Sequence, residues 1–171
     1  MKTRCNWVGK DPLYIRYHDT EWGVGVYEDQ KLFEMLSLES FQAGLSWITI
    51  LKKRETFRLE FENFDLEKVA HFSSEKVDSM LLNSGIVRHR GKIEATINNA
   101  KCILKIIEEE GGFYKFLKPF LNTEKDASVA ISKELKKKGF KFVGATTVYS
   151  FMQASGMVND HELDCFRYKE V

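Results

Sequence analysis

The spacing of apolar residues predicts helices over most of the chain. The most regular stretch places one apolar residue on the same face at each successive helical turn. Gly111 and Gly112 follow this stretch, and glycine directly after an amphipathic helix commonly ends it. We therefore predict a long helix that ends at Gly111. Its apolar positions are Ile93, Ile97, Ala100, Leu104 and Ile107.

Two further helices are predicted on either side of a break formed by Ala43 and Gly44. Before the break, apolar residues from Leu32 to Phe41 share one helical stripe. After it, Ser46 carries a hydroxyl suited to capping the next helix. The break therefore reads as a tight turn between two helices.

Shorter elements follow from capping residues and glycine positions. Asp65 is suited to cap one short helix, and Ser73 or Ser74 another, which Gly85 would end. The remaining predictions are a basic turn at residues 85–92, a short aromatic helix at 113–121, a polar loop at 122–128, a helix ending in the lysines 136–138, a glycine-bounded hairpin at 139–144 and a helix at 145–155.

Residues 1–27 show little helical periodicity but are dense in Trp and Tyr. Such side chains favour burial, so we expect this segment to be pinned to the body of the protein. No stretch shows a convincing strand pattern, and no Asn-Gly or Asp-Gly hairpin turn is present. The sequence predicts one all-α domain over residues 1–171.

Composition agrees with a single packed domain. A chain of 171 residues buries about two-thirds of its unfolded surface. Thirteen Phe among 43% hydrophobic residues predict an aromatic core between helices. No apolar run reaches the roughly 18 residues of a membrane helix. The charged N-terminus lacks the apolar core of a secretion signal, so we expect a cytoplasmic monomer that does not enter a membrane.

The net charge of +1 conceals three basic clusters, at residues 52–54, 88–92 and 133–141. Acidic residues gather elsewhere, most clearly at residues 108–110. If the three clusters share one face, they form a phosphate-binding surface on a nearly neutral protein. The alternative for each cluster is an ordinary solvated helix face.

Residues 38–54 contain the strongest candidate for a ligand site. Glu39 lies in an otherwise apolar helix, and Trp47 lies just beyond the break at Ala43 and Gly44. A carboxylate and an indole on either side of a tight turn can form the wall of a pocket for a small, flat ligand, including a cationic one.

The hairpin at residues 139–144 is a candidate anion site. A glycine-bounded turn before a helix presents free backbone N–H groups. Gly139 and Gly144 bound this turn, and Lys141 with the lysines at 136–138 adds positive charge. Together they could hold DNA phosphates without reading sequence. The alternative is an ordinary helical hairpin with a lysine-rich face.

Two cysteine–histidine pairs lie near the chain ends: Cys5 with His18, and His161 with Cys165. The four-residue spacing of the second pair places both side chains on one face of a helix. Two Cys and two His form a closed, structural zinc set, which leaves no open position for a catalytic water. Such a site would tie the N-terminal segment to the C-terminus. Spacing alone does not decide it, because Cys5 and His18 lie farther apart than in a small zinc finger.

Six segments carry long, distinctive motifs over nearly the whole chain. Together they closely resemble the DNA-3-methyladenine glycosylase I family. The segments are 11–19 (DPLYIRYHD), 21–24 (EWGV), 42–47 (QAGLSW), 85–93 (GIVRHRGKI), 138–144 (KGFKFVG) and 159–161 (NDH).

The resemblance implies a helix-hairpin-helix fold and hydrolysis of the N-glycosidic bond of 3-methyladenine in alkylated double-stranded DNA, which starts base-excision repair. It also implies a structural Zn²⁺ held by Cys5, His18, His161 and Cys165. Relatives with lyase activity carry a lysine just after the hairpin glycine, where this chain has Ala145, so we expect a monofunctional enzyme. The alternative is a zinc-stabilised protein that binds alkylated DNA without turnover.

The family's base pocket maps onto Trp7, Tyr14, Tyr17, Glu39 and Trp47. The chemistry of these residues agrees, because indoles can stack on a base and attract a cation, and a carboxylate can accept hydrogen bonds from a cationic adenine. We predict Glu39 as the catalytic and recognition carboxylate, with water as the nucleophile. Gly139, Lys141 and Gly144 are the predicted DNA-backbone contacts.

Three features modify this prediction. Asp160 lies where related glycosylases place a catalytic Asp, but this family is described as lacking that residue, so Glu39 ranks above it. Residues 24–25 and 40–41 depart from the family, which predicts a reshaped pocket edge beside Glu39. The segment 117–128 is shorter than in typical members, which predicts altered DNA affinity if that loop touches DNA.

Overall fold

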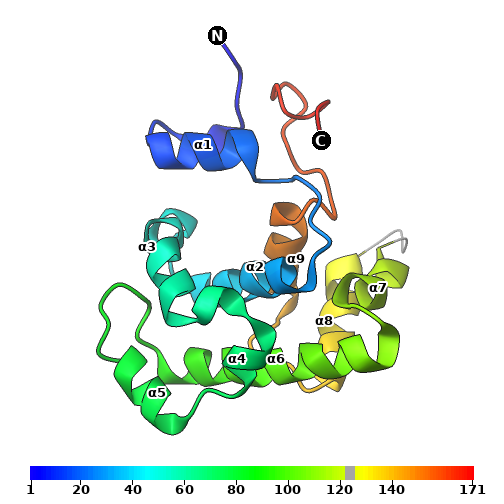
Figure 1. Cartoon of the computed structure of the whole chain (residues 1–171). Coiled ribbons are helices and arrows are strands. Elements are labelled where there is room, and N and C mark those ends of the chain that lie inside the picture. Colours follow the sequence, from blue (N-terminus) through cyan, green and yellow to red (C-terminus); the bar gives the residue numbers. More distant parts are fainter. Residues whose placement is uncertain (122–125) are drawn as a thin grey trace.

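The computed structural model describes residues 1–121 and 126–171, and all regular structure in these residues is helical (Figure 1). This confirms the all-α prediction. The α-helices are α1 (Pro12–Thr20), α2 (Asp29–Gln42), α3 (Trp47–Glu60), α4 (Leu66–Ala70), α5 (Ser74–Met80), α6 (Arg90–Glu110), α7 (Phe113–Leu117), α8 (Ala127–Lys137) and α9 (Ala145–Ala154), and the 3₁₀ turns are η1 (Asn6–Val8), η2 (Glu62–Phe64) and η3 (Lys118–Phe120).

The main core lies where α2, α6 and α9 pack together, and aromatic rings fill much of it. Phe41 packs against Phe57 with ring centroids 4.8 Å apart, and Phe61 stacks on Phe64 at 5.2 Å. Each such ring contributes roughly 1.5–3 kcal/mol by burial. The predicted aromatic core is confirmed.

Several predicted helix ends are confirmed in detail. The Asp65 carboxylate accepts from the backbone N–H of Lys68 at the start of α4, and Ser73 caps α5 in the same way. Gly111 ends α6 with φ 87°, a left-handed conformation that glycine adopts without strain. Ser46 occupies the N-cap position of α3, but its hydroxyl pairs with Thr49 Oγ1 at 2.7 Å and caps no backbone N–H.

The N-terminal segment is more helical than its sequence suggests. Asp11 accepts from the backbone N–H of Leu13 at 2.9 Å, and Pro12 occupies the first helical position of α1. Both features favour a helix start even without a strong apolar stripe. The segment is pinned as expected: the N–H of Phe166 donates to Thr3 O at 2.9 Å, and α1 lies beside the C-terminal segment in Figure 1.

Two predicted boundaries differ. Helix α5 ends at Met80 instead of at Gly85, because backbone N–H groups at residues 81–83 close a series of short turns. The predicted basic turn at residues 85–92 is helical in its last three residues, because His89 accepts from the N–H of Lys92 and α6 begins at Arg90. Residues 122–125 of the predicted polar loop lie outside the described residues, and α8 begins within the rest of it, at Ala127.

Among the described helices, none has both the length and the apolar composition that crossing a membrane requires.

Candidate functional site

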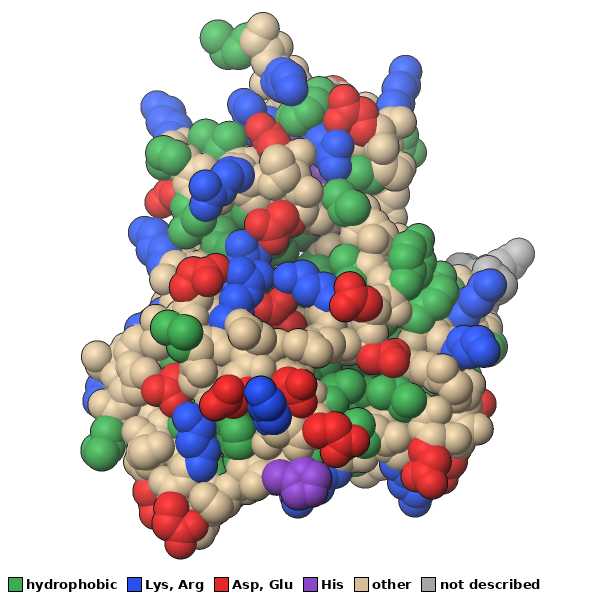
Figure 2. Space-filling view, viewed as in Figure 1, with side chains coloured by type: hydrophobic (Ala, Val, Ile, Leu, Met, Phe, Trp, Pro, Cys, Tyr) green, Lys and Arg blue, Asp and Glu red, His purple; other side chains and the backbone are tan. Residues whose placement is uncertain are grey.

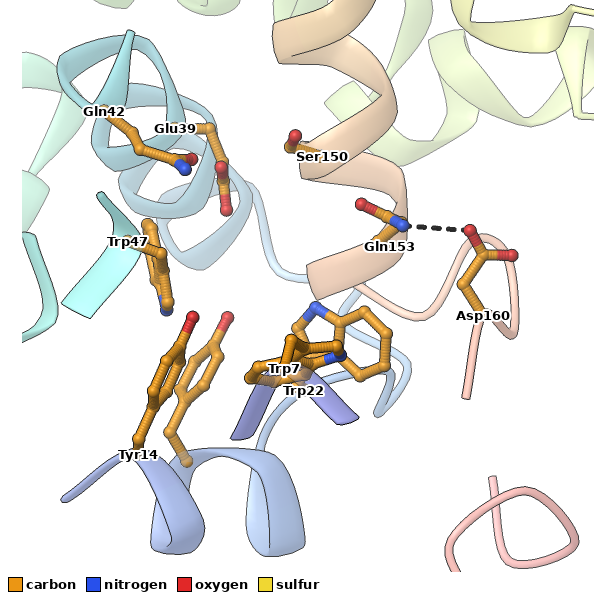
Figure 3. A pocket seen from close by; sticks show the side chains of 10 residues that line it. Trp7, Tyr14, Trp22, Glu39, Gln42, Trp47, Ser150, Gln153 and Asp160 are labelled. Atoms are coloured by element: carbon orange, nitrogen blue, oxygen red, sulfur yellow. Dashed lines mark hydrogen bonds between the residues drawn. The ribbon is translucent and has the colours of Figure 1, made fainter. Parts of the chain in front are cut away.

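A cavity of about 230 Å³ opens where η1 and α1 face the ends of α2, α3 and α9 (Figure 3). The five side chains predicted to form the base pocket all line it, although they come from four separate elements. The complete lining is Trp7, Tyr14, Tyr17, Trp22, Glu39, Gln42, Trp47, Ser150, Gln153 and Asp160.

Glu39 projects from the last turns of α2 into this cavity and is only 6% exposed. Burial is the one cause of its raised pKa, which reaches about 8. No described residue pairs with its carboxylate. A buried carboxylate without a partner costs free energy, so its presence at a cavity wall points to a ligand that supplies the partner.

Aromatic rings surround the open side of Glu39. Tyr17 and Trp47 lie with ring centroids 5.5 Å apart, and Trp7 contacts Tyr14 at 5.0 Å and Trp22 at 4.9 Å. Trp47 Nε1 is buried and has no hydrogen-bond partner among the described residues. The cavity thus offers flat apolar surfaces, a carboxylate and a free N–H donor, which suits a flat heterocycle with polar edges.

Five of the lining residues were outside the predicted base pocket, although a periodic signal was present for three of them. Gln42 lies three positions after Glu39 on α2, and Ser150 and Gln153 lie three apart on α9, so each pair shares a helix face. Trp22 carried no comparable signal. Asp160, the second candidate catalytic carboxylate, lies at the rim and accepts from Gln153 Nε2 at 2.9 Å.

The unusual residues 40–41 do not reach the cavity. The Phe41 ring is fully buried in the main core. Ser40 Oγ faces the hairpin and contacts Phe142 O at 3.1 Å. The predicted reshaping of the pocket edge beside Glu39 therefore does not come from these two side chains.

The basic clusters do not form one open phosphate surface. Arg54 pairs with Glu21 at 2.6 Å, and Lys92 is buried, where it donates to the carbonyl oxygens of Phe41 and Ala43. Lys138 pairs with Glu109 of α6 at 3.3 Å. Figure 2 shows basic and acidic side chains interspersed over one face of the molecule.

The hairpin between α8 and α9 is rigidly seated, and Lys141 is exposed at its surface. The side-chain amide of Asn99 both donates to Lys141 O and accepts from Lys141 N, each at 2.9 Å. Gly139 has φ 93°, which glycine tolerates. Gly144 stands at the N-terminus of α9 with no side-chain cap and open space around it, so the first N–H groups of α9 remain free.

The four predicted metal ligands form one buried cluster whose ligand atoms all lie within 4.8 Å of one another. Sγ of Cys165 lies 3.4 Å from Nε2 of His18 and 3.5 Å from Nδ1 of His161, and Sγ of Cys5 lies 3.6 Å from the same Nδ1. His161 and Cys165 come together through turns and bends at residues 161–165, and not on one face of a helix.

Neighbouring groups orient both histidines toward the cluster. His18 Nδ1 contacts Asp19 at 2.8 Å, and His161 Nε2 donates to Trp22 O at 3.0 Å, so the other nitrogen of each ring presents its lone pair inward. In a tetrahedral zinc site, Zn–S and Zn–N bond lengths place sulfur and nitrogen ligands about 3.6 Å apart. The donor set and its spacing fit a metal ion.

In the described residues the structure combines a helical fold, a cavity whose lining suits a flat, polar-edged ligand, and a Cys/His cluster that could hold a metal ion. Comparison with known proteins makes this specific. The family model for methyladenine glycosylases matches residues 7–168. The chain belongs to the methyladenine glycosylase family.

Two named relatives align with this chain over almost its full length. DNA-3-methyladenine glycosylase 1 of Escherichia coli (strain K12) is 51% identical over 180 aligned positions, which cover 96% of each chain. The Haemophilus influenzae DNA-3-methyladenine glycosylase is 46% identical, covering 96% of this chain and 97% of its own.

Solved structures show the same fold. A crystal structure of 3-methyladenine DNA glycosylase I superimposes with a TM-score of 0.91 at 50% identity, covering 96% of this chain and 98% of that one. A structure of the Staphylococcus aureus 3-methyladenine DNA glycosylase I, studied for its recognition of 3-methyladenine, superimposes with a TM-score of 0.90 at 40% identity, covering 95% of both chains.

Proposed function

We propose that this protein is a monofunctional DNA-3-methyladenine glycosylase that hydrolyses the N-glycosidic bond of 3-methyladenine in alkylated double-stranded DNA. Its relatives carry that name. The observation that supports the activity best is the aromatic cavity with the unpartnered carboxylate of Glu39 in its wall. The whole chain acts as one glycosylase domain, as a cytoplasmic monomer.

Binding begins when the damaged nucleotide leaves the DNA stack. Extrusion costs a few kcal/mol, and less for a damaged, weakly paired base. The rings of Trp7, Tyr14, Tyr17 and Trp47 replace the lost stacking, and attraction between a cationic base and an indole face contributes about 0.5–2 kcal/mol. The cavity of about 230 Å³ accommodates a single flat base.

Glu39 distinguishes 3-methyladenine from adenine by charge. 3-Methyladenine in DNA is a cation, and a cation in contact with a buried carboxylate favours the ionised form of that carboxylate. The ionised Glu39 then accepts hydrogen bonds from the base edge, and such charge-assisted bonds are about twice as strong as neutral ones. Neutral adenine has no positive charge, so it does not offset the cost of ionising the buried Glu39, whose pKa burial raises.

Hydrolysis needs little chemical activation because the leaving base is already cationic. A water oxygen bonds to C1′ while the C1′–N9 bond breaks, and the bond's electron pair neutralises the base. Glu39 stabilises the cationic base until that step. Ala145 and Thr146 stand where bifunctional relatives carry a Schiff-base lysine, so the reaction stops at the abasic site.

The buried cluster of Cys5, His18, His161 and Cys165 is proposed to hold Zn²⁺ as a closed structural site. The metal supplies folding free energy by cross-linking the two chain ends. Cys5 lies two positions before Trp7, and His18 lies on the same helix as Tyr14 and Tyr17. The cluster therefore fixes the aromatic wall that faces Glu39.

The hairpin is proposed to hold the DNA backbone through Gly139, Lys141, Gly144 and the free N–H groups of α9. We expect Lys141→Glu to weaken binding to damaged and undamaged duplexes alike. The slope of log K against log salt concentration should become shallower by roughly 0.9, the contribution of one phosphate contact. Fluorescence anisotropy at several salt concentrations measures both effects. A weakening confined to damaged DNA would contradict the backbone role.

The function is tested by incubating the wild-type protein with methylated duplex DNA and measuring the released free bases. Release of 3-methyladenine, leaving intact abasic strands, is the expected result. The second candidate, a zinc-stabilised binder of alkylated DNA, predicts tight binding of the duplex with no released base. That outcome would refute the enzymatic proposal.

A further inference from the structure

A hydrogen-bonded group at the cavity rim has no role in the mechanism above. The carboxylate of Asp160 accepts from Gln153 Nε2 at 2.9 Å and from the hydroxyl of Tyr149. The hydrogen bond to Asp160 raises the pKa of Tyr149 to about 12, so the phenol of Tyr149 keeps the proton that it donates. Gln153 and Asp160 both line the cavity, whereas Tyr149 lies outside it.

This contact fixes the orientation of the Gln153 amide. An ionised carboxylate can only accept hydrogen bonds, so the NH₂ group of Gln153 must face Asp160. The amide oxygen is therefore turned the other way, toward the cavity, as Figure 3 shows. Tyr149 holds Asp160 from a second side, which keeps the carboxylate in place at an exposed position.

Gln153 and Glu39 lie at different depths of the cavity. Glu39 is 6% exposed, whereas Asp160, the partner of Gln153, is exposed and stands at the rim. A base that reaches Glu39 with its polar edge leaves its bond to the sugar nearer the rim. Gln153 is itself half-buried, between the buried Glu39 and the exposed Asp160, so we expect its oxygen on the side of the cavity nearer the glycosidic bond.

We propose that Gln153, oriented by Asp160, holds the water molecule that attacks C1′ of the flipped nucleotide. This rests on the proposed glycosylase function and adds a residue to it. The amide oxygen accepts one hydrogen bond from the water and directs the water oxygen toward C1′. As the C–O bond forms, the C1′–N9 bond breaks, its electron pair stays on N9, and the extra proton of the water passes to solvent.

A neutral amide suffices for this role because the leaving base is cationic and the water needs orientation more than deprotonation. Asp160 is a positioning residue: it acts through the Gln153 amide and does not touch the reacting atoms. This differs from a direct catalytic role for Asp160.

The test compares Gln153→Met, Asp160→Asn and the double variant. Methionine keeps the length of the side chain but removes the amide oxygen, and asparagine lets the Gln153 amide turn over. Two quantities are measured: the single-turnover rate of base release from methylated DNA, and the affinity for free 3-methyladenine from tryptophan fluorescence. Gln30→Met is the matched control, because Gln30 donates an amide hydrogen bond to Asn63 O far from the cavity.

Gln153→Met should slow release roughly tenfold to hundredfold, with the affinity for the free base unchanged within about twofold. Asp160→Asn should slow base release about tenfold. The double variant should release base no more slowly than Gln153→Met, because Asp160 acts through Gln153. Gln30→Met should release base at the wild-type rate.

Three results would overturn the inference while leaving the glycosylase proposal intact. One is a Gln153→Met rate within about twofold of wild type. Another is an affinity for the free base that falls in parallel with the rate, which would make Gln153 a base-binding residue. The third is a double variant whose losses multiply, which would give Asp160 an independent role. Failure of the wild-type protein to release base would instead refute the proposed function itself.

Discussion

Glu39→Gln is expected to reduce the release of 3-methyladenine from alkylated DNA by roughly 10²–10³-fold. Glutamine has nearly the same shape and can still accept one hydrogen bond, but it carries no negative charge. The loss therefore measures the attraction between the carboxylate and the cationic base. Single-turnover assays with enzyme below saturation, read as released free base, give kcat/KM, which includes the binding of the cationic base.

The pH dependence provides a second signature of Glu39. Burial raises its pKa to about 8, so the empty cavity holds the protonated acid at neutral pH. Because kcat/KM reports the ionisation of the free enzyme, it should rise with pH and level off above about 8. Glu39→Gln should lack this rise.

The same substitution should change stability in the opposite direction from activity. The Glu39 pKa is about 8 in the folded chain and near 4.5 when exposed, so between these values the folded state holds a proton that the unfolded state releases. Wild-type stability therefore falls as pH rises through this window. Glu39→Gln removes this loss and should be more stable at pH 8, on the order of a few kcal/mol, in urea unfolding.

The matched control is Glu110→Gln, an exposed carboxylate at the end of α6. It should keep both wild-type activity and the wild-type slope of stability with pH. Full activity of Glu39→Gln would contradict the recognition role of the carboxylate. A loss of stability at pH 8 would contradict the burial cost assigned to it.

Local patterns in the sequence predict much of this site. Glu39 stands out because a lone carboxylate interrupts an apolar stripe, and Trp47 because it follows a helix break. The resemblance then added Trp7, Tyr14 and Tyr17 from a segment with little periodicity. The cavity places all five together, but their contacts with a base remain predictions.

Pairings between distant residues were not predictable from local pattern. Arg54 and Lys92 look like phosphate ligands in a basic cluster, yet one neutralises Glu21 and the other caps carbonyl oxygens at the end of α2. The orientation of Gln153 by Asp160 likewise depends on how the C-terminal segment folds back onto α9. A basic cluster in a sequence identifies possible hydrogen-bond donors, but the groups that accept from them can be identified only from tertiary contacts.

Cys165→Ser is expected to abolish the proposed zinc binding and to destabilise the N-terminal wall of the cavity. Loss of one of four ligands weakens a closed zinc site, and such sites contribute on the order of 10 kcal/mol to folding. We expect zinc content, measured by elemental analysis, to fall from about one per chain to nearly none. The thermal unfolding midpoint should fall with it, while the main core around α2, α6 and α9 keeps its helical circular dichroism.

Cys102→Ser is the control, because Cys102 is the one cysteine outside the cluster. It should keep its zinc and its unfolding midpoint. Binding of free 3-methyladenine separates the remaining alternatives: in Cys165→Ser it should weaken, because Trp7 and Tyr14 lose their anchor on the metal-binding segment. A zinc hydrolase would lose activity without losing stability. A zinc-free Cys165→Ser protein that is stable and binds the base normally would contradict the structural role of the metal.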